Sequence, residues 1–277
     1  MTRRHSPIIQ RKLADAEPRS RPPHLSLQQD ARMKDRYRQQ WEALGSYDPY
    51  WAVISDPAKR RGKWNKEEFF QSGIIEIGDV LARLNALGLT PNFDVALDFG
   101  CGVGRLSSAL AKHFKRVLGV DISQSMLTEA RSANAHIGNI EFIHNIEQNL
   151  RVVDSGSVDF LYSNLVLQHM PRERQEIFIR EFCRVLRPGA TLLFQTPSRP
   201  NLRTMRGWAH RLAGNRVLNI ARRLRQGRDG VMELHTLEQS RVLQILAEQR
   251  MKLVQVEPNS CAGLAFHSYS YCATKNL

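Results

Sequence analysis

The sequence predicts an α/β protein built on a doubly wound sheet, and two observations carry that prediction. Short apolar runs alternate with helix-length segments from residue 93 onward, which is the pattern of successive βαβ units and a parallel sheet. A glycine-rich loop from Gly100 to Gly104 follows the first of these runs directly. In doubly wound sheets, the turn between a strand and its helix is where ligands bind.

The expected elements can be placed in chain order. A helix is predicted over residues 67–87, because apolar residues from Phe70 to Leu84 recur at helical spacing and Gly88 suits its C-terminal end. Strands are predicted at 93–99, 116–121, 140–144, 158–164 and 190–197. The intervening helices are predicted at about 104–114, 124–135 and 171–187. A last helix, 236–250, precedes strands at 251–258 and 268–275, which are expected to pair as an antiparallel hairpin.

The chain carries a formal charge of +13, and the excess lies outside the central domain. Residues 1–30 are predicted to be a disordered basic arm, and residues 31–66 an aromatic-rich extension that folds over the main domain, 67–277. Between Arg199 and Arg228 there are nine arginines and no acidic residue. This basic segment is expected to form one or two amphipathic helices within an insertion, 199–232. It indicates either an anionic partner or a solvated surface.

Composition excludes several classes of protein. No apolar run approaches the roughly 18 residues that a membrane span needs, and the arginine-rich start lacks the apolar core of a secretory signal. The four cysteines show neither a CxxC pair nor zinc-site spacing. We therefore expect a cytoplasmic protein with reduced thiols and no structural metal.

The residues around the glycine loop discriminate between ligands. A dinucleotide fingerprint needs a third glycine where this chain has Arg105. Asp98 precedes the loop and would repel a pyrophosphate, but it suits a cationic amino group. Asp121 ends the second predicted strand, where an acid can hold both ribose hydroxyls. These features fit S-adenosylmethionine, which is cationic and lacks phosphate, better than NAD.

Three stretches resemble the class I S-adenosylmethionine-dependent methyltransferases, in particular type 11 and type 25 domains. The stretch VALDFGCGVGRLSSALAKHFKRVLGVDISQSML is similar to the first two motifs of that family. SVDFLYSNLVLQHMP and EFCRVLRPGATLLFQTP resemble its fourth- and fifth-strand motifs. The resemblance covers about residues 67–198 and 236–277. It implies a seven-stranded sheet in the order 3-2-1-4-5-7-6 with strand 7 antiparallel, and S-adenosylmethionine as cofactor.

The same resemblance implies roles for individual residues. The loop glycines would surround the methionine and ribose portions of the cofactor, and Ile122 would pack on the adenine. The family often has an acid after the third strand that meets the adenine amine, but this chain has Asn145 and Ile146 there, so Asn145 or backbone groups would serve instead. The implied cofactor site comprises Asp98, Gly100, Cys101, Gly102, Gly104, Asp121, Ile122, Asn145, Ile146 and Asn164.

The acceptor chemistry is less constrained. His169, just past the fourth strand, is a candidate general base for a hydroxyl acceptor, with loop structure as the alternative role. The motifs of amine-methylating nucleic-acid enzymes, cytosine C5 enzymes and arginine methyltransferases are missing. We therefore expect O-methylation of a small molecule, such as a sugar, a lipid-linked compound or a natural product. The insertion, through residues 199–228, would form a lid that binds the acceptor, an anionic group or a membrane surface.

Three alternatives stay open on sequence grounds. The chain could methylate a quinone or lipid at a membrane surface, as ubiquinone-pathway O-methyltransferases do. RNA methylation is disfavoured because no motif supports it. The chain could also bind S-adenosylmethionine without turning it over.

Overall fold

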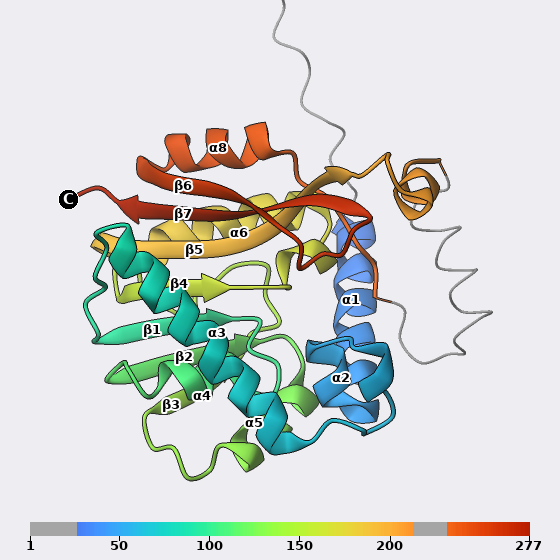
Figure 1. Cartoon of the computed structure of the whole chain (residues 1–277), viewed down its shortest axis with the longest axis horizontal. Helices are drawn as coiled ribbons and strands as arrows, with labels where there is room; N and C mark the ends of the chain where they lie inside the picture. The colour runs from blue at the N-terminus through green and yellow to red at the C-terminus, as the bar shows by residue number, and fades with distance from the viewer. Residues whose placement is uncertain (1–26, 213–231) are drawn as a thin grey trace, which may run out of the picture. The chain divides into compact units, whose positions relative to one another are not determined.

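The computed structural model describes residues 27–212 and 232–277 (Figure 1). The chain forms two compact units, Met1–Tyr37 and Arg38–Leu277, with the boundary inside helix α1, Leu27–Tyr47. The sheet and the cavities described below belong to the second unit. Among the described residues, no helix has the length and apolarity that a membrane crossing requires.

Seven strands form one mixed sheet in the order β3-β2-β1-β4-β5-β7-β6. In chain order they are β1 (Val95–Phe99), β2 (Arg116–Asp121), β3 (Ile140–His144), β4 (Val158–Ser163), β5 (Leu186–Pro200), β6 (Met251–Asn259) and β7 (Phe266–Lys275). Strands β1 to β5 pair in parallel, whereas β7 runs antiparallel to both β5 and β6. The predicted fold class, strand order and terminal hairpin are therefore confirmed.

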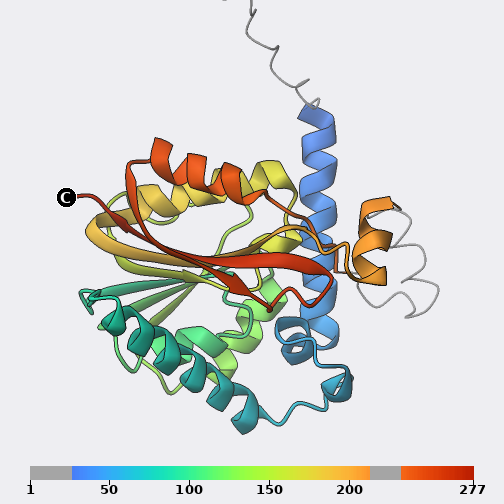
Figure 2. The ribbon, with the colours of Figure 1, turned by 45° about the horizontal axis from the view of Figure 1, so that its top comes forward.

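Helices cover both faces of the sheet. Those assigned from α2 onward are α2 (Pro49–Val53), α3 (Lys66–Ala86), α4 (Arg105–Leu110), α5 (Gln124–Ala133), α6 (Arg172–Val185) and α8 (Gln239–Glu248), with short 3-10 turns η1 (Pro57–Lys59) and η2 (Leu167–His169). Figure 2 shows α3, α4 and α5 below the sheet and α6 and α8 above it. The strand order reverses between β1 and β4. In a doubly wound sheet, the crevice that binds ligands lies at this topological switch point.

The main core lies between the sheet and the α3–α4 layer. Ile77 and Leu84 of α3 pack with Leu110, Phe114 and Phe160, all of them nearly inaccessible to solvent. Each buried side chain of this size contributes about 1.5–3 kcal/mol relative to an exposed one. This layer holds the glycine loop, which precedes α4, rigidly against the sheet.

The N-terminal part of the second unit packs onto the domain through a separate apolar cluster. Leu44 and Tyr50 contact a group that includes Phe69, Val103 and Met126. Tyr50 and Phe69 meet edge to face, with ring centroids 4.9 Å apart. Val103 belongs to the glycine loop, so this extension lies directly over the loop.

Some element boundaries differ from those predicted. The predicted helix 171–187 ends at Val185, and β5 starts at Leu186, because Leu186 already pairs with Val158 of β4. At its other end β5 continues to Pro200, which pairs with Phe266, so the strand outlasts the Pro197 at which it was expected to stop. Of the basic segment, residues 205–212 are helical, and residues 213–231 lie outside the described part of the chain.

Candidate functional site

The glycine loop bends sharply at the carboxyl end of β1. The backbone amides of Gly100 and Cys101 both donate to the carbonyl of Val120, at 2.8 and 3.1 Å, which ties the loop to β2. Gly100 has φ +76° and Gly102 has φ +53°, a left-handed conformation that side chains resist. A β-carbon at Gly102 would also collide with Val53 of α2. The glycines are therefore required both by backbone conformation and by close approach of the N-terminal extension.

Asp121 lies at the end of β2, facing this loop. One carboxylate oxygen accepts from the Gly102 amide at 2.9 Å, and the other accepts from the Ser123 amide at 2.9 Å. Burial raises the pKa of Asp121, although these backbone hydrogen bonds favour the charged form. A carboxylate offers about four lone-pair positions, so acceptor capacity remains for ligand hydroxyls.

Asp98 is buried beneath the loop, within β1. Its carboxyl accepts a hydrogen bond from the Ser107 hydroxyl at 2.6 Å, and it is only 1% exposed. Burial raises the pKa of Asp98 to about 7, against the opposing effect of Ser107 and Arg105. A cation bound nearby would favour the charged carboxylate. Burial likewise raises the pKa of the neighbouring Cys101 thiol well above its usual value.

A polar network joins the end of β4 to helix α3. Glu76 accepts from Tyr162 Oη and Asn164 Nδ2, each at 2.8 Å, and forms an ion pair with Arg105 at 2.6 Å. Arg105, which replaces the third glycine of a dinucleotide site, is thereby held away from the loop. The Asn164 Oδ1 atom is buried and has no hydrogen-bond partner within the described ranges, 27–212 and 232–277. It is therefore an acceptor available to a donor group on a ligand.

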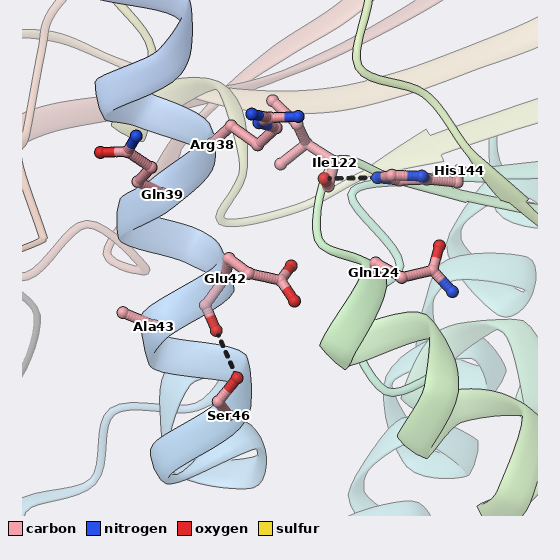
Figure 3. Close-up of a pocket in the computed structure, with 8 residues that line it drawn as sticks. All are labelled: Arg38, Gln39, Glu42, Ala43, Ser46, Ile122, Gln124 and His144. Carbon is pink, nitrogen blue, oxygen red and sulfur yellow. Dashed lines mark hydrogen bonds between the residues drawn. The ribbon is translucent and has the colours of Figure 1, made fainter.

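A cavity of about 330 Å³ lies between α1 and the start of α5 (Figure 3). Its lining residues are Arg38, Gln39, Glu42, Ala43, Ser46, Ile122, Gln124 and His144. The His144 ring nitrogen Nε2 lies 3.0 Å from the Ile122 carbonyl, which fixes that side of the cavity. The structure thus places Ile122 in a cavity wall.

Glu42 fastens α1 to this wall. Its carboxylate accepts from the Ser125 amide at 3.0 Å and from the Ser123 hydroxyl at 3.0 Å. Burial alone would raise the pKa of Glu42, but these hydrogen bonds outweigh it and hold the pKa below its usual value. The carboxylate also lies at the N-terminus of α5, where the helix dipole favours negative charge.

Asn145 and Ile146 stand apart from the described lining of this cavity. The Asn145 side chain donates to the Asn149 carbonyl at 2.7 Å and accepts from the Glu147 amide at 3.2 Å. Its amide is thus engaged in a local turn. Ile146 is 46% exposed.

A second cavity, of about 480 Å³, adjoins the glycine loop through Val53, the residue that a β-carbon at Gly102 would meet. It is lined by Trp51, Ala52, Val53, Ile54, Ser55, Asp56, Leu165, Gln168, His169, Met232, Leu234, Cys261 and Ala262. Leu165 has φ +63°, a conformation that costs a side-chain-bearing residue roughly 1–3 kcal/mol. Strain of this kind is concentrated at functional sites, and here it turns the chain from β4 into η2.

His169 is buried in the wall of this second cavity. Its Nδ1 lies 2.9 Å from the Glu233 carbonyl, and its Nε2 lies 3.2 Å from Gln168 Nε2. The ring also meets Trp41 edge-on, with centroids 5.1 Å apart. Burial lowers the pKa of His169 to about 4, so the imidazole is neutral at physiological pH.

Sequence reasoning missed several of the residues that line the two cavities. Arg38, Glu42 and Trp51 come from the N-terminal extension, and Cys261 comes from the β6–β7 loop. The aromatic density of residues 31–66 was the available signal for the extension. Nothing in the local sequence marked Glu42 or Cys261, because only the folded chain brings them to the site.

Comparison with known proteins agrees with this geometry. Residues 97–194 match the family model described as a methyltransferase domain. A trans-aconitate 2-methyltransferase from Deinococcus radiodurans is 33% identical over 49% of this chain and 50% of its own length. A malonyl-[acyl-carrier protein] O-methyltransferase from Methylococcus capsulatus is 34% identical over 47% of each chain. The chain thus spans half or less of the length of these relatives.

Solved structures share the fold. A magnesium protoporphyrin IX methyltransferase from Synechocystis with bound SAH superposes with a TM-score of 0.58, covering 88% of this chain and 99% of that one at 22% identity. A methyltransferase from Clostridium acetobutylicum gives a TM-score of 0.55, covering 82% of this chain and 98% of that one at 17% identity. These similarities concern the fold.

Proposed function

This chain contains a class I S-adenosylmethionine-dependent methyltransferase domain, and we propose that it methylates a hydroxyl group on a small molecule. The observation that carries the proposal is the pair of cavities, one lined by Ile122, next to Asp121, and the other lined by Val53, which contacts the glycine loop at Gly102. One cavity adjoins Asp121 through Ile122, and the other contains His169. A methyl donor that spans the loop would present its methyl group to the second cavity.

The residues present fit the donor. We assign Asp121 to the ribose hydroxyls, because its carboxylate has acceptor capacity left after binding Gly102 and Ser123. The cavity beside Ile122 is of a size and character to take the adenine. The unpartnered Asn164 Oδ1 and the buried Asp98 suit the ammonium group of the methionine portion. The donor supplies an electrophilic methyl group on a sulfonium sulfur.

The chain's own residues orient the reactants. Much of the rate of a methyl transfer comes from holding the nucleophile in line with the methyl group, and the walls of the second cavity would do this. His169 would act on the hydroxyl proton through Nε2, since the Glu233 carbonyl occupies its Nδ1–H; the Gln168 amide would give up its hydrogen bond to Nε2 at that step. The apolar members of the wall, including Trp51 and Leu165, would exclude water from the reacting atoms.

The test is a calorimetric titration of the purified chain with S-adenosylmethionine and, separately, with NAD. We expect saturable binding of S-adenosylmethionine and none of NAD. Binding of NAD alone would overturn the assignment of this site. A methyl-labelled donor then separates an enzyme from a protein that only binds the donor, because only an enzyme moves the label.

A lipid-linked acceptor is a second candidate, favoured by the surface around residues 201–212. Met205 is 89% exposed, Leu212 77% and Leu264 80%. Asn201 joins the two segments, because its side chain donates to the Leu264 carbonyl at 3.0 Å. Arg203, also exposed, stands among these apolar side chains, as amphipathic membrane-surface segments require.

Flotation with vesicles tests this candidate. The chain should float with vesicles containing phosphatidylserine, and less so with neutral phosphatidylcholine vesicles or at high salt. Replacing Met205 and Leu212 by Ser should abolish flotation. If the wild-type chain does not float with either kind of vesicle, a freely diffusing acceptor is favoured.

A further inference from the structure

The side chain of Gln168 carries an unpartnered acceptor atom in the wall of the second cavity. Gln168 is only 5% exposed, and its Oε1 atom is buried with no hydrogen-bond partner among the residues that the structure describes. Leaving such an atom unsatisfied destabilises the folded protein, and buried polar side chains are rarely left without a hydrogen-bond partner. A group that enters the cavity and donates a hydrogen bond would remove this cost.

The orientation of the Gln168 amide follows from its neighbour. The Glu233 carbonyl can only accept, so His169 Nδ1, at 2.9 Å, carries the proton. His169 Nε2 is then a lone-pair acceptor, and it must receive the Gln168 Nε2–H group at 3.2 Å. The amide nitrogen faces the imidazole, and the amide oxygen is the atom left for another partner.

The charge of the cavity also favours a neutral group that donates a hydrogen bond. Asp56 is among the lining residues, with its Oδ1 accepting from the Ala58 amide at 2.9 Å, and none of the described lining residues is Lys or Arg. An acceptor carboxylate would face the negative end of the Gln168 carbonyl dipole, with no Lys or Arg among the described lining residues to balance it. A hydroxyl or a neutral amine would instead donate to Gln168 Oε1. The remaining lining is mostly apolar, with Trp51, Leu165 and Leu234 among it.

We propose that Gln168 Oε1 receives the hydrogen bond of the acceptor group, so that the acceptor is a neutral hydroxyl or amine on an apolar scaffold and not a carboxylate. This inference rests on the proposed methyl transfer; it excludes a carboxylate as the acceptor and admits a neutral amine beside the proposed hydroxyl. The acceptor lone pair forms the new bond to the methyl carbon as the carbon–sulfur bond breaks. The electron pair of that bond stays on sulfur, and the acceptor proton passes through His169 to water.

The bond that is formed gives a direct test. The chain is incubated with methyl-labelled S-adenosylmethionine and the small-molecule fraction of a cell extract, and the labelled product is treated with alkali. A methyl ether or methylamine keeps its label, which is the expected result. Release of labelled methanol shows a methyl ester and overturns the inference, while leaving methyl transfer itself intact. Failure of the wild-type chain to bind the donor would instead defeat the proposed function.

A substitution tests the residue. Gln168→Met keeps the shape of the side chain but removes Oε1, together with the Nε2–H group that His169 accepts. At limiting extract the variant should label product about tenfold more slowly, the loss expected for one hydrogen bond of roughly 1.4 kcal/mol. The rate should recover as the extract is concentrated, because the defect lies in acceptor binding.

Donor affinity and the melting temperature of the variant show whether the fold is kept. Gln244→Met is the matched control, since Gln244 is exposed on α8 and bonds only to Glu248 in that helix. A folded Gln168→Met chain that labels product as fast as this control at limiting extract would also overturn the inference.

Discussion

Asp121→Asn is the substitution that most sharply separates a ribose-binding carboxylate from a structural one. The wild-type carboxylate accepts one backbone hydrogen bond on each oxygen, from Gly102 and from Ser123, both at 2.9 Å. In the variant an amide nitrogen replaces one oxygen, so a donor faces one of these backbone donors. The negative charge that would bind the ribose hydroxyls is lost as well.

The magnitude follows from the type of bond. Hydrogen bonds to a charged group contribute about 1.5–3 kcal/mol each, so loss of one raises the Kd for S-adenosylmethionine about 10- to 150-fold. Calorimetry at 25 °C measures this directly. Asp154→Asn is the matched control, because Asp154 is exposed in the turn before β4.

Thermal melting distinguishes the two roles of the carboxylate. If Asp121→Asn remains folded when it is saturated with donor, and its Kd for the donor is raised, the assignment of Asp121 to the ribose is supported. If folded Asp121→Asn binds the donor as tightly as Asp154→Asn does, Asp121 only holds the loop, and the reasoning is refuted.

Three further predictions concern neighbouring residues. Because the pKa of Asp98 is raised to about 7, the folded state keeps a proton that the unfolded state releases near pH 4. The free energy of unfolding should therefore fall as the pH rises from about 4 to 7. Chemical denaturation should show a flatter dependence of this free energy on pH in Asp98→Asn. His169→Gln should lower kcat about 10²–10⁴-fold with donor affinity little changed, and a near wild-type kcat would leave the imidazole only a role in holding Gln168 and Glu233. Glu42→Ala should weaken donor binding by about 1–2 kcal/mol in calorimetry, because α1 loses its hydrogen bonds to Ser125 and Ser123; unchanged affinity would remove α1 from the donor site.

Local patterns were sufficient to predict the sheet. Alternating apolar runs located all seven strands, and the motif resemblance implied the order that the structure shows. Asp121 could be placed beside the loop because it ends a strand next to β1, and the carboxyl ends of parallel strands meet at one edge.

Boundaries set by pairing partners were not predictable in this way. Pro188 and Gly189 look like the end of a helix, but Leu186 pairs with β4 before them and so starts the strand earlier. Pro200 looks like a strand terminator, yet pairing with Phe266 carries β5 through it. Such ends depend on a partner strand that is distant in the sequence.

The parts of the site that come from distant segments were also beyond local reading. Glu42 reaches Ser125 from a helix that lies about 80 residues earlier in the chain, and the only hint was aromatic density. Gln168 was passed over in favour of its neighbour His169, because an amide gives no titration signal. Its importance depends on an unpartnered oxygen, which only the coordinates reveal.

Transfer of a labelled methyl group tests the central claim most directly. The purified chain is incubated with methyl-labelled S-adenosylmethionine and a cell extract, and the label is followed into small molecules, protein and RNA. We predict that label accumulates in a small molecule and that the transfer depends on Asp121. Label that accumulates only in RNA or protein, or a chain that binds the donor and transfers no label to any fraction, would contradict it.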